Sequence, residues 1–282
     1  MKVRLPYRAG TFYAGSANTL KKQIEECFLN INSIRALPKV NKKGPRNIIS
    51  LISPHAGYMY SGPVAAWGYY NLARDGRPES IIILGPNHTG VGSGVSTMIN
   101  GVWRTPLGDV EIDTDLAQKI QRVSKIMDID DTSHRYEHSI EVQIPFLQYL
   151  FGSSFKIVPI CMMMQDLQTS KDVGLAIVEA TSKKNVLIIA STDMTHYESH
   201  KNAEIKDKLA IEAILKLDEQ LLHSTIEVNN ISMCGYGPTS ATILASKKLG
   251  ATEAQLICYK TSGDITSDRS RVVGYASISM NK

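Results

Sequence analysis

Three runs of apolar residues recur along this chain, and a histidine follows each run within a few positions. Short apolar runs rich in isoleucine, leucine and valine, bounded by turn residues, are typical of inner strands in a parallel sheet. The carboxyl ends of such strands meet at one edge of the sheet, where the sites of α/β proteins gather. We therefore expect a site at that edge. The runs cover residues 48–52, 81–84 and 186–190, and the histidines are His55, His88 and His196.

The chain is long enough to form one large domain around this sheet. It has 282 residues, of which 43% are hydrophobic, and a chain of this size can bury a large core. Pro63 lies between the first two runs, at a position suited to the first turn of a connecting helix. We predict a single domain, residues 1–282, of the α/β class, with a mostly parallel central sheet flanked by helices.

Composition and charge argue against several classes of protein. The net charge is only +4, and the basic residues 39–46 lie in a segment with Pro and Gly but no aromatic residue, so no nucleic-acid partner is expected. No apolar run approaches the ~20 residues of a membrane helix. The four cysteines form no CxxC pair and no secretory leader is evident. We expect a cytoplasmic protein with reduced thiols and no membrane partner. The oligomeric state stays open.

The segment from His134 to His138 carries two histidines and a glutamate. If it were helical, His134 and His138 would share a face, because residues four apart lie one turn apart. The pattern His-x-x-Glu-His also occurs in inverted zinc peptidases, where both histidines bind zinc and the glutamate is the base. The alternative is that these side chains form hydrogen bonds around a helix N-terminus. Between the two, we predict that Glu137 and His138 contribute to the pocket.

Cys234 is the best candidate of the four cysteines for a ligand or a reactive thiol. It lies just before a helix that Pro238 or Thr239 is expected to start. The partial positive charge of a helix N-terminus lowers the pKa of a nearby thiol. We therefore expect a lowered pKa for Cys234, whereas Cys27 is expected in the core.

Seven blocks of this sequence together resemble the Memo family, whose members occur in archaea, bacteria and eukaryotes. The blocks stand in the family's order and extend from about Arg4 to Ala276. Memo-like proteins are similar in fold to the class III extradiol ring-cleaving dioxygenases, in which two histidines and a carboxylate hold iron(II), so the resemblance implies that fold here. The blocks are AGTFYAG, PHAGYMYSGPVAAWGYY, LGPNHTG, WRTPLGDVEID, EHSIEVQIPFLQYL, ASTDMTHY and VVGYA.

The resemblance implies a mononuclear metal site in this chain. His55 and His88 take the places of the two histidines, and Cys234 takes the place of the carboxylate. Two histidines, an anionic ligand and open positions suit non-haem iron(II), while a thiolate moves the preference toward copper or zinc. Iron or copper is therefore expected first, and zinc remains an alternative.

Three functions fit the expected pocket. In the first, the metal supports redox or oxygen-dependent chemistry, with His196 as acid or base and Asp193 orienting either His196 or a bound water. In the second, zinc activates a water for hydrolysis with help from the same two residues. In the third, the protein is not an enzyme and binds a metal or a peptide as a carrier or interaction module. In each case the ligand is a small molecule or a peptide, and the pocket is completed by Tyr60, Glu137 and His138.

Overall fold

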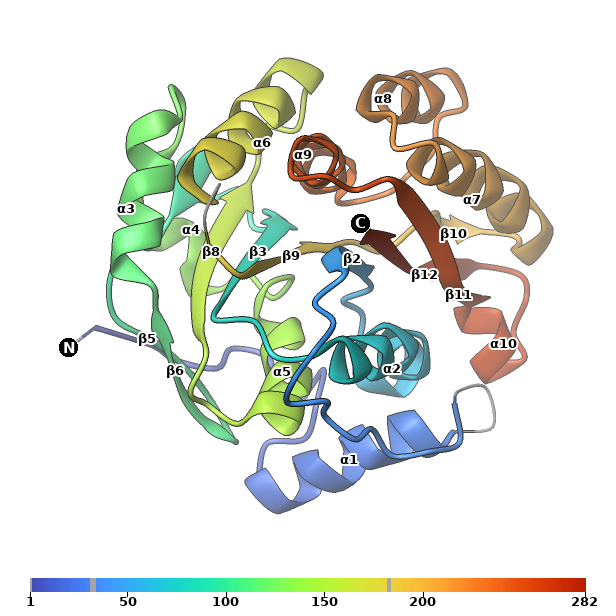
Figure 1. Cartoon of the computed structure of the whole chain (residues 1–282). Coiled ribbons are helices and arrows are strands. Elements are labelled where there is room, and N and C mark those ends of the chain that lie inside the picture. The colour runs from blue at the N-terminus through green and yellow to red at the C-terminus, as the bar shows by residue number, and fades with distance from the viewer. Residues whose placement is uncertain (1, 31–33, 182–183) are drawn as a thin grey trace.

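A mixed β-sheet runs through the centre of the protein (Figure 1). The computed structural model describes residues 2–30, 34–181 and 184–282. Its strands are β1 Val3–Arg4, β2 Ile48–Ser53, β3 Ser80–Pro86, β4 Val95–Thr97, β5 Val102–Thr105, β6 Gly108–Ile112, β7 Asp128–Ile129, β8 Lys156–Met162, β9 Val186–Ser191, β10 His196–Glu198, β11 Glu253–Thr261 and β12 Val272–Asn281.

The three apolar runs of the sequence form β2, β3 and β9 in the middle of this sheet. The central order is β8, β3, β9, β2, and these four strands run parallel to one another. β12 continues the sheet beside β2 in the antiparallel direction. β2 and β3 are buried along their whole length, which explains why their sequences are continuous rather than alternating apolar runs.

Helices cover both faces of the sheet (Figure 1). α1, α2 and α5 pack together on one face, and α3, α6, α9, α8 and α7 pack in succession on the other. The prediction of an α/β fold with a mostly parallel central sheet flanked by helices is therefore confirmed. The helices are α1 Ala17–Leu29, α2 Tyr58–Asp75, α3 Thr114–Val123, α4 Thr132–Arg135, the 3-10 helix η1 Glu141–Gln143, α5 Ile144–Phe151, α6 Leu167–Thr181, α7 His200–Leu215, α8 Glu219–Val228, α9 Tyr236–Lys248 and α10 Ser262–Thr266.

The helix after the first strand begins earlier than expected. α2 starts at Tyr58 and contains Pro63 in its interior, so the prediction that Pro63 starts this helix is wrong. A backbone contact fixes the true start, because the Tyr58 N–H donates to the carbonyl oxygen of Phe12 at 2.8 Å. The early start places the first turn of α2 directly after His55.

The core lies on both sides of the sheet. One cluster of buried side chains includes Leu51, Ile82 and Phe146, and it also contains Cys27, which is 5% exposed. The expectation that Cys27 belongs to the core is confirmed. A second cluster, on the side of α7 to α9, includes Ile214 and other aliphatic residues. The sheet between the two clusters is the rigid frame on which the loops at its carboxyl edge are built.

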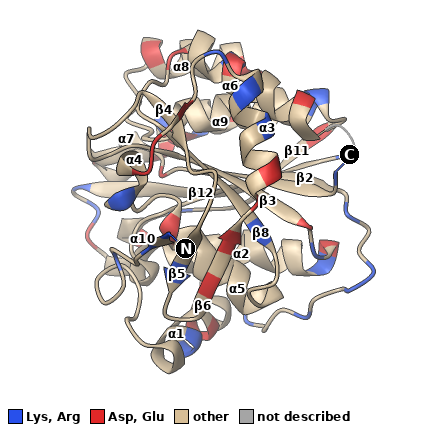
Figure 2. Ribbon diagram, turned by 90° about the vertical axis from the view of Figure 1, so that its left-hand side faces the viewer, with Lys and Arg blue, Asp and Glu red and all other residues tan. Residues whose placement is uncertain are grey.

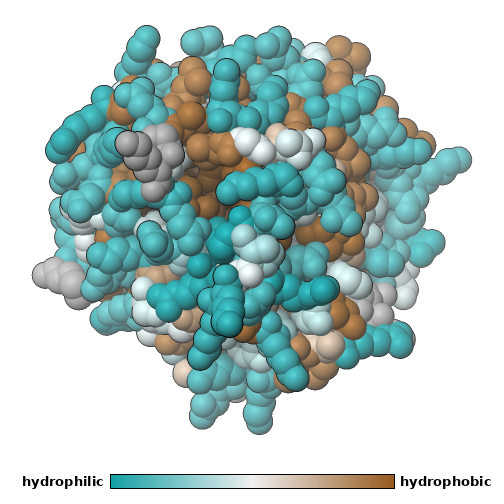
Figure 3. Space-filling model, viewed as in Figure 1, coloured by the Kyte–Doolittle hydropathy of each residue, from teal (hydrophilic) through white to brown (hydrophobic). Residues whose placement is uncertain are grey.

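The surface of the protein is mixed in charge and mostly polar. Figure 2 shows basic and acidic residues interspersed over the helices and loops of one side. Figure 3 shows a largely hydrophilic face with smaller areas of hydrophobic side chains between polar ones. Among the described residues, no helix is long and apolar enough to span a membrane.

Candidate metal centre

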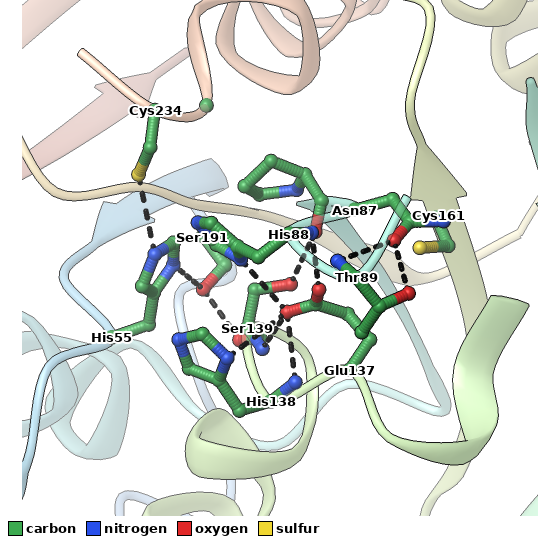
Figure 4. Close-up of polar contacts among 12 residues, drawn as sticks. His55, Asn87, His88, Thr89, Glu137, His138, Ser139, Cys161, Ser191 and Cys234 are labelled. Carbon is green, nitrogen blue, oxygen red and sulfur yellow. Dashed lines mark hydrogen bonds and ion pairs between the residues drawn. The ribbon is translucent and has the colours of Figure 1, made fainter. Parts of the chain in front are cut away.

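Three histidines from three separate segments meet beyond the carboxyl ends of the parallel strands. His55 follows β2, His88 follows β3, and His138 lies between α4 and η1. One ligand atom of each lies within 4.8 Å of the other two, and the rings of His88 and His138 stack with their centroids 4.7 Å apart. Figure 4 shows the three side chains around a common space, and the group is compact enough to hold a metal ion.

A serine fixes the tautomer of His55. Nδ1 of His55 lies 3.0 Å from Oγ of Ser191. That hydroxyl donates its proton to the Ser139 carbonyl oxygen at 2.6 Å and accepts a hydrogen bond from Nε2 of Gln143 at 2.7 Å. Toward His55 it can therefore only accept, so Nδ1 carries the proton and Nε2 keeps a free lone pair. Metal-binding histidines are commonly supported in this way through the nitrogen that faces away from the metal.

Glu137 supports His88 in the same manner and lies close to His138. Its carboxylate is fully buried, and Oε1 accepts a hydrogen bond from Nδ1 of His88 at 3.0 Å. Nδ1 of His138 lies 3.3 Å from the same oxygen. The carboxylate also accepts the backbone N–H groups of His88, His138 and Ser139. Because an ionised carboxylate only accepts, Nδ1 of His88 carries a proton and its Nε2 is free.

The site keeps His55 and His138 neutral and its glutamate charged. Burial lowers the pKa of His55 well below its usual range, and burial together with the neighbouring His55 lowers the pKa of His138 to about 3. Burial alone would raise the pKa of Glu137, but the hydrogen bonds that it accepts from His88 and from the backbone N–H of Ser139 help to hold that pKa well below its usual range. At neutral pH, His55 and His138 are therefore in the form that binds metals.

Close packing against β3 positions the segment that carries Glu137 and His138. Oγ of Ser139 donates to the carbonyl oxygen of Pro86 at 2.9 Å. At Gly85, an added Cβ atom would lie 2.3 Å from the Ser139 hydroxyl oxygen. Only glycine therefore allows this approach, and the approach brings His138 to the histidines of β2 and β3.

A buried arginine holds the same segment from the other side. Arg4, in β1, forms an ion pair with Glu141, and both side chains are almost completely buried. Nε of Arg4 donates to the His134 carbonyl oxygen at 3.0 Å, and its Nη2 donates to the Glu137 carbonyl oxygen. Glu141 in turn accepts a hydrogen bond from the Tyr13 hydroxyl at 2.5 Å. The amino-terminal segment is thus part of the frame of the site.

Cys234 lies beside the histidine group. Its Sγ is 3.2 Å from Nε2 of His55 and accepts the backbone N–H of Asp193 at 3.3 Å (Figure 4). Burial and the charge of Asp193 raise the pKa of this thiol. The prediction that the following helix lowers the pKa of Cys234 is therefore wrong in the metal-free protein, because desolvation outweighs the helix N-terminus. Since Nδ1 of His55 carries the proton, the thiol donates to Nε2, and Cys234 lies next to the three-histidine group without belonging to it.

A cavity of about 690 Å³ opens onto the histidines. Tyr60, Asp193 and His196 line it. Nδ1 of His196 donates to the Ser232 carbonyl oxygen, 2.9 Å away, which leaves Nε2 free. Asp193 is buried and accepts the backbone N–H of His55 at 2.8 Å, and burial raises the pKa of its carboxyl group.

His134 lies apart from the histidine group. The helix α4 is a single turn that ends at Arg135, so His134 and His138 do not share a helix face as the helical interpretation predicted. His134 is fully buried, its ring is 5.8 Å from that of Trp103, and burial and the charge of Arg4 lower its pKa to about 4. His134 belongs to the structural core of the region.

Acidification is expected to destabilise the protein partly through His134. The unfolded side chain binds a proton near pH 6.5, whereas the folded one stays neutral down to a pKa of about 4. The unfolded state therefore binds more protons in this window, and the free energy of unfolding falls as the pH drops from 6.5 to 4 and levels off below. Urea unfolding of metal-free wild type and His134→Gln should differ in slope by up to about 1.4 kcal/mol per pH unit. Parallel curves would contradict this.

Sequence reasoning missed the residues behind the histidines. Ser191 and Gln143 give no sequence signal of their own, since a serine at a strand end and a glutamine before a helix are common. Glu137 and His138 were expected in the pocket, but their placement around His88 depends on a loop. The pattern of histidines after strand ends predicts His55 and His88 as site residues. It does not predict which residues accept the hydrogen bonds from their Nδ1 atoms.

Known sequences and structures resemble this chain along most of its length. The sequence pattern of the family described as "Memo-like protein" matches residues 4–279. A MEMO1 family protein of Methanopyrus kandleri is 52% identical over 277 residues, covering 98% of both chains. A MEMO1 family protein of Methanothermobacter thermautotrophicus is 50% identical over 279 residues, covering 98% of this chain and 100% of that one. The fold, with 12% sequence identity, resembles that of an uncharacterized protein of Escherichia coli K12, with a TM-score of 0.53 over 83% of this chain and 100% of that one.

Proposed function

This chain belongs to the Memo-like protein family, and from that premise we propose that its histidine pocket binds one redox-active metal ion next to a small organic ligand. The proposal rests on the hydrogen-bond acceptors that hold the histidine rings in place. Ser191 and Glu137 hold Nδ1 of His55 and of His88, which leaves the Nε2 atoms of these two histidines to bind a metal, and a ligand atom of His138 lies within 4.8 Å of theirs. Such support is typical of metal sites.

The donor atoms of the site suit iron or copper, and they could also bind zinc. His55, His88 and His138 would supply three imidazole nitrogens, and Cys234 would add a sulfur beside His55. Imidazole suits iron, copper and zinc, and a thiolate favours copper and zinc. Because the thiol of Cys234 is protonated in the metal-free protein, its binding to a metal would release a proton. A bound iron or copper ion would supply one-electron redox chemistry at this site.

The neighbouring residues define what the protein itself contributes. His196 presents Nε2 to the cavity with its Nδ1 held by a carbonyl oxygen, which is the arrangement of a proton acceptor for a bound ligand. Asp193 holds the backbone of His55 through its carboxylate and so orients that ligand. The cavity of about 690 Å³ has room for a small molecule. We propose oxygen-dependent oxidation of such a molecule as the reaction class.

Elemental analysis tests the metal. Protein purified without oxygen, chelator or an affinity metal is expected to contain close to one equivalent of iron or copper. His55→Ala and Cys234→Ala should lose most of it, since each removes a donor atom of the site. His223→Ala is the matched control, because His223 is a buried histidine packed against Tyr236, away from this group. Equal metal content in all variants would contradict the proposal.

The same measurement separates the alternatives. Zinc in wild type, together with hydrolytic activity that survives without oxygen, would favour a zinc-dependent hydrolase. Absence of any metal, with retained affinity for a peptide, would favour a binding module without catalysis. A His138→Ala variant distinguishes two ligand sets. If His138→Ala keeps the metal and Cys234→Ala loses it, the ligands are His55, His88 and Cys234.

A further inference from the structure

The cavity next to the histidines has walls of aromatic side chains. Besides the residues already described, it is lined by Phe12, Tyr60, Tyr197 and Tyr275. Tyr197 lies 5.8 Å from His196, measured between ring centroids, and Phe12 lies 4.9 Å from His138. Aromatic walls around a space of this volume favour a ligand with a flat, apolar body.

Arg271 is the one lysine or arginine among the described residues that line this cavity. Its guanidinium carbon lies over the ring of Tyr197, 5.7 Å from the centroid. Within the described part of the chain it donates no hydrogen bond and joins no ion pair that meets ordinary distance limits. The neighbouring Arg269 differs, since its Nη2 lies 3.5 Å from Oδ1 of Asp264. Arg271 is thus a solvent-exposed residue of the cavity lining whose guanidinium has no protein acceptor among the described residues.

The nearby acidic residue does not take up these donors. Asp268 also lines the cavity, but its Oδ1 accepts from the backbone N–H of Ser270 at 2.9 Å and from the Ser270 hydroxyl at 2.6 Å. The carboxylate of Asp268 thus forms its hydrogen bonds within its own loop. A guanidinium with five donors and no acceptor matches a planar carboxylate, which it can bind through two parallel hydrogen bonds.

We propose that Arg271 binds the carboxylate of an aromatic acid, whose ring lies between the aromatic walls and reaches toward the histidines. The proposal names the ligand class of the same pocket and rests on the proposed function only for the metal end of that ligand. Binding of the acid group itself requires the arginine and the aromatic residues, and no metal.

A matched pair of probes tests this. 2-Naphthoate and 2-naphthamide have the same ring and nearly the same shape, and they differ in charge. In calorimetric titrations of chelator-treated wild type, the acid is expected to bind about tenfold more tightly than the amide, because a charge-assisted pair contributes more than a neutral hydrogen bond. Arg271→Gln should reduce the affinity for the acid to that for the amide. Arg271→Lys should retain part of the preference, since lysine keeps the charge and loses the planar fork.

Arg269→Gln is the control, because it removes the same charge two positions away, outside the cavity lining. It should keep the full preference for the acid. Equal affinity for acid and amide in wild type, a preference that survives Arg271→Gln, or no binding of either probe at millimolar concentration would each overturn the proposal. The titrations are repeated on the metal-loaded protein. A wild type that takes up no metal when metal is offered, and still prefers the acid, would overturn the metal function and leave Arg271 as the anion-binding residue.

Discussion

Replacing Arg4 with alanine is expected to lower the free energy of unfolding by about 3–5 kcal/mol, the typical cost of removing one partner of a buried ion pair. The substitution leaves the carboxylate of Glu141 buried and uncompensated. It also removes the donors to the carbonyl oxygens of His134 and Glu137 and the contact of the guanidinium with the ring of Trp103, whose centroid is 4.4 Å away. Urea unfolding of the metal-free protein at pH 7 measures the effect.

An exposed arginine provides the matched control. Arg104 pairs with Asp109 through two hydrogen bonds of 2.7 and 2.8 Å, yet its side chain is 48% exposed. Because water screens such a pair, Arg104→Ala should leave the urea midpoint almost unchanged. If both variants lost the same stability, the burial of the Arg4 pair would not be what makes it important.

Replacing Glu137 with alanine is expected to weaken metal binding by about 10–100-fold. Loss of the acceptor behind a metal-binding histidine typically costs about 10–100-fold in affinity, and Glu137 is that acceptor for His88. The substitution also removes the charge that would partly neutralise the ion. Competition with a chelator of known affinity measures the change, and circular dichroism shows whether the variant folds.

Two further variants give this experiment its controls. Glu137→Gln keeps one acceptor oxygen and loses the charge, so its affinity should lie between those of wild type and Glu137→Ala. Glu219→Ala removes another buried carboxylate, paired with Lys247 at 2.9 Å, and it should bind metal like wild type. Affinity within twofold of wild type in Glu137→Ala would mean that packing alone orients the histidines and that Glu137 has no role in metal binding.

The sheet could be predicted because its evidence is local. β2, β3 and β9 are continuous apolar runs ended by turn residues. This pattern is typical of inner strands in a parallel sheet. The positions of His55 and His88 then follow from the strand ends. The first residue of a helix is harder to predict, because it can depend on contacts with distant residues. In α2 the first turn is fixed by a hydrogen bond between Tyr58 and Phe12.

The contacts of Glu137 and Ser191, and the pKa of Cys234, could not be predicted from sequence, for two physical reasons. Glu137 reaches His88 because Gly85 lets a distant loop approach β3, and no spacing rule reveals that approach. The pKa of Cys234 depends on competition between burial, which raises it, and a helix N-terminus, which lowers it. The helix can be predicted from the sequence, whereas the burial of this cysteine cannot. The metal, and any reaction, remain proposals that the named experiments test.

The contact between Arg4 and Glu141 also bears on how much of the chain the pocket needs. The two residues are 137 positions apart, and β2 pairs with β9 over a similar separation, Ser50 opposite Ile188. Contacts of such long sequence separation cost loop-closure entropy before they stabilise the fold. We therefore expect the histidine group to be complete only when the whole domain has folded, with its amino-terminal strand in place.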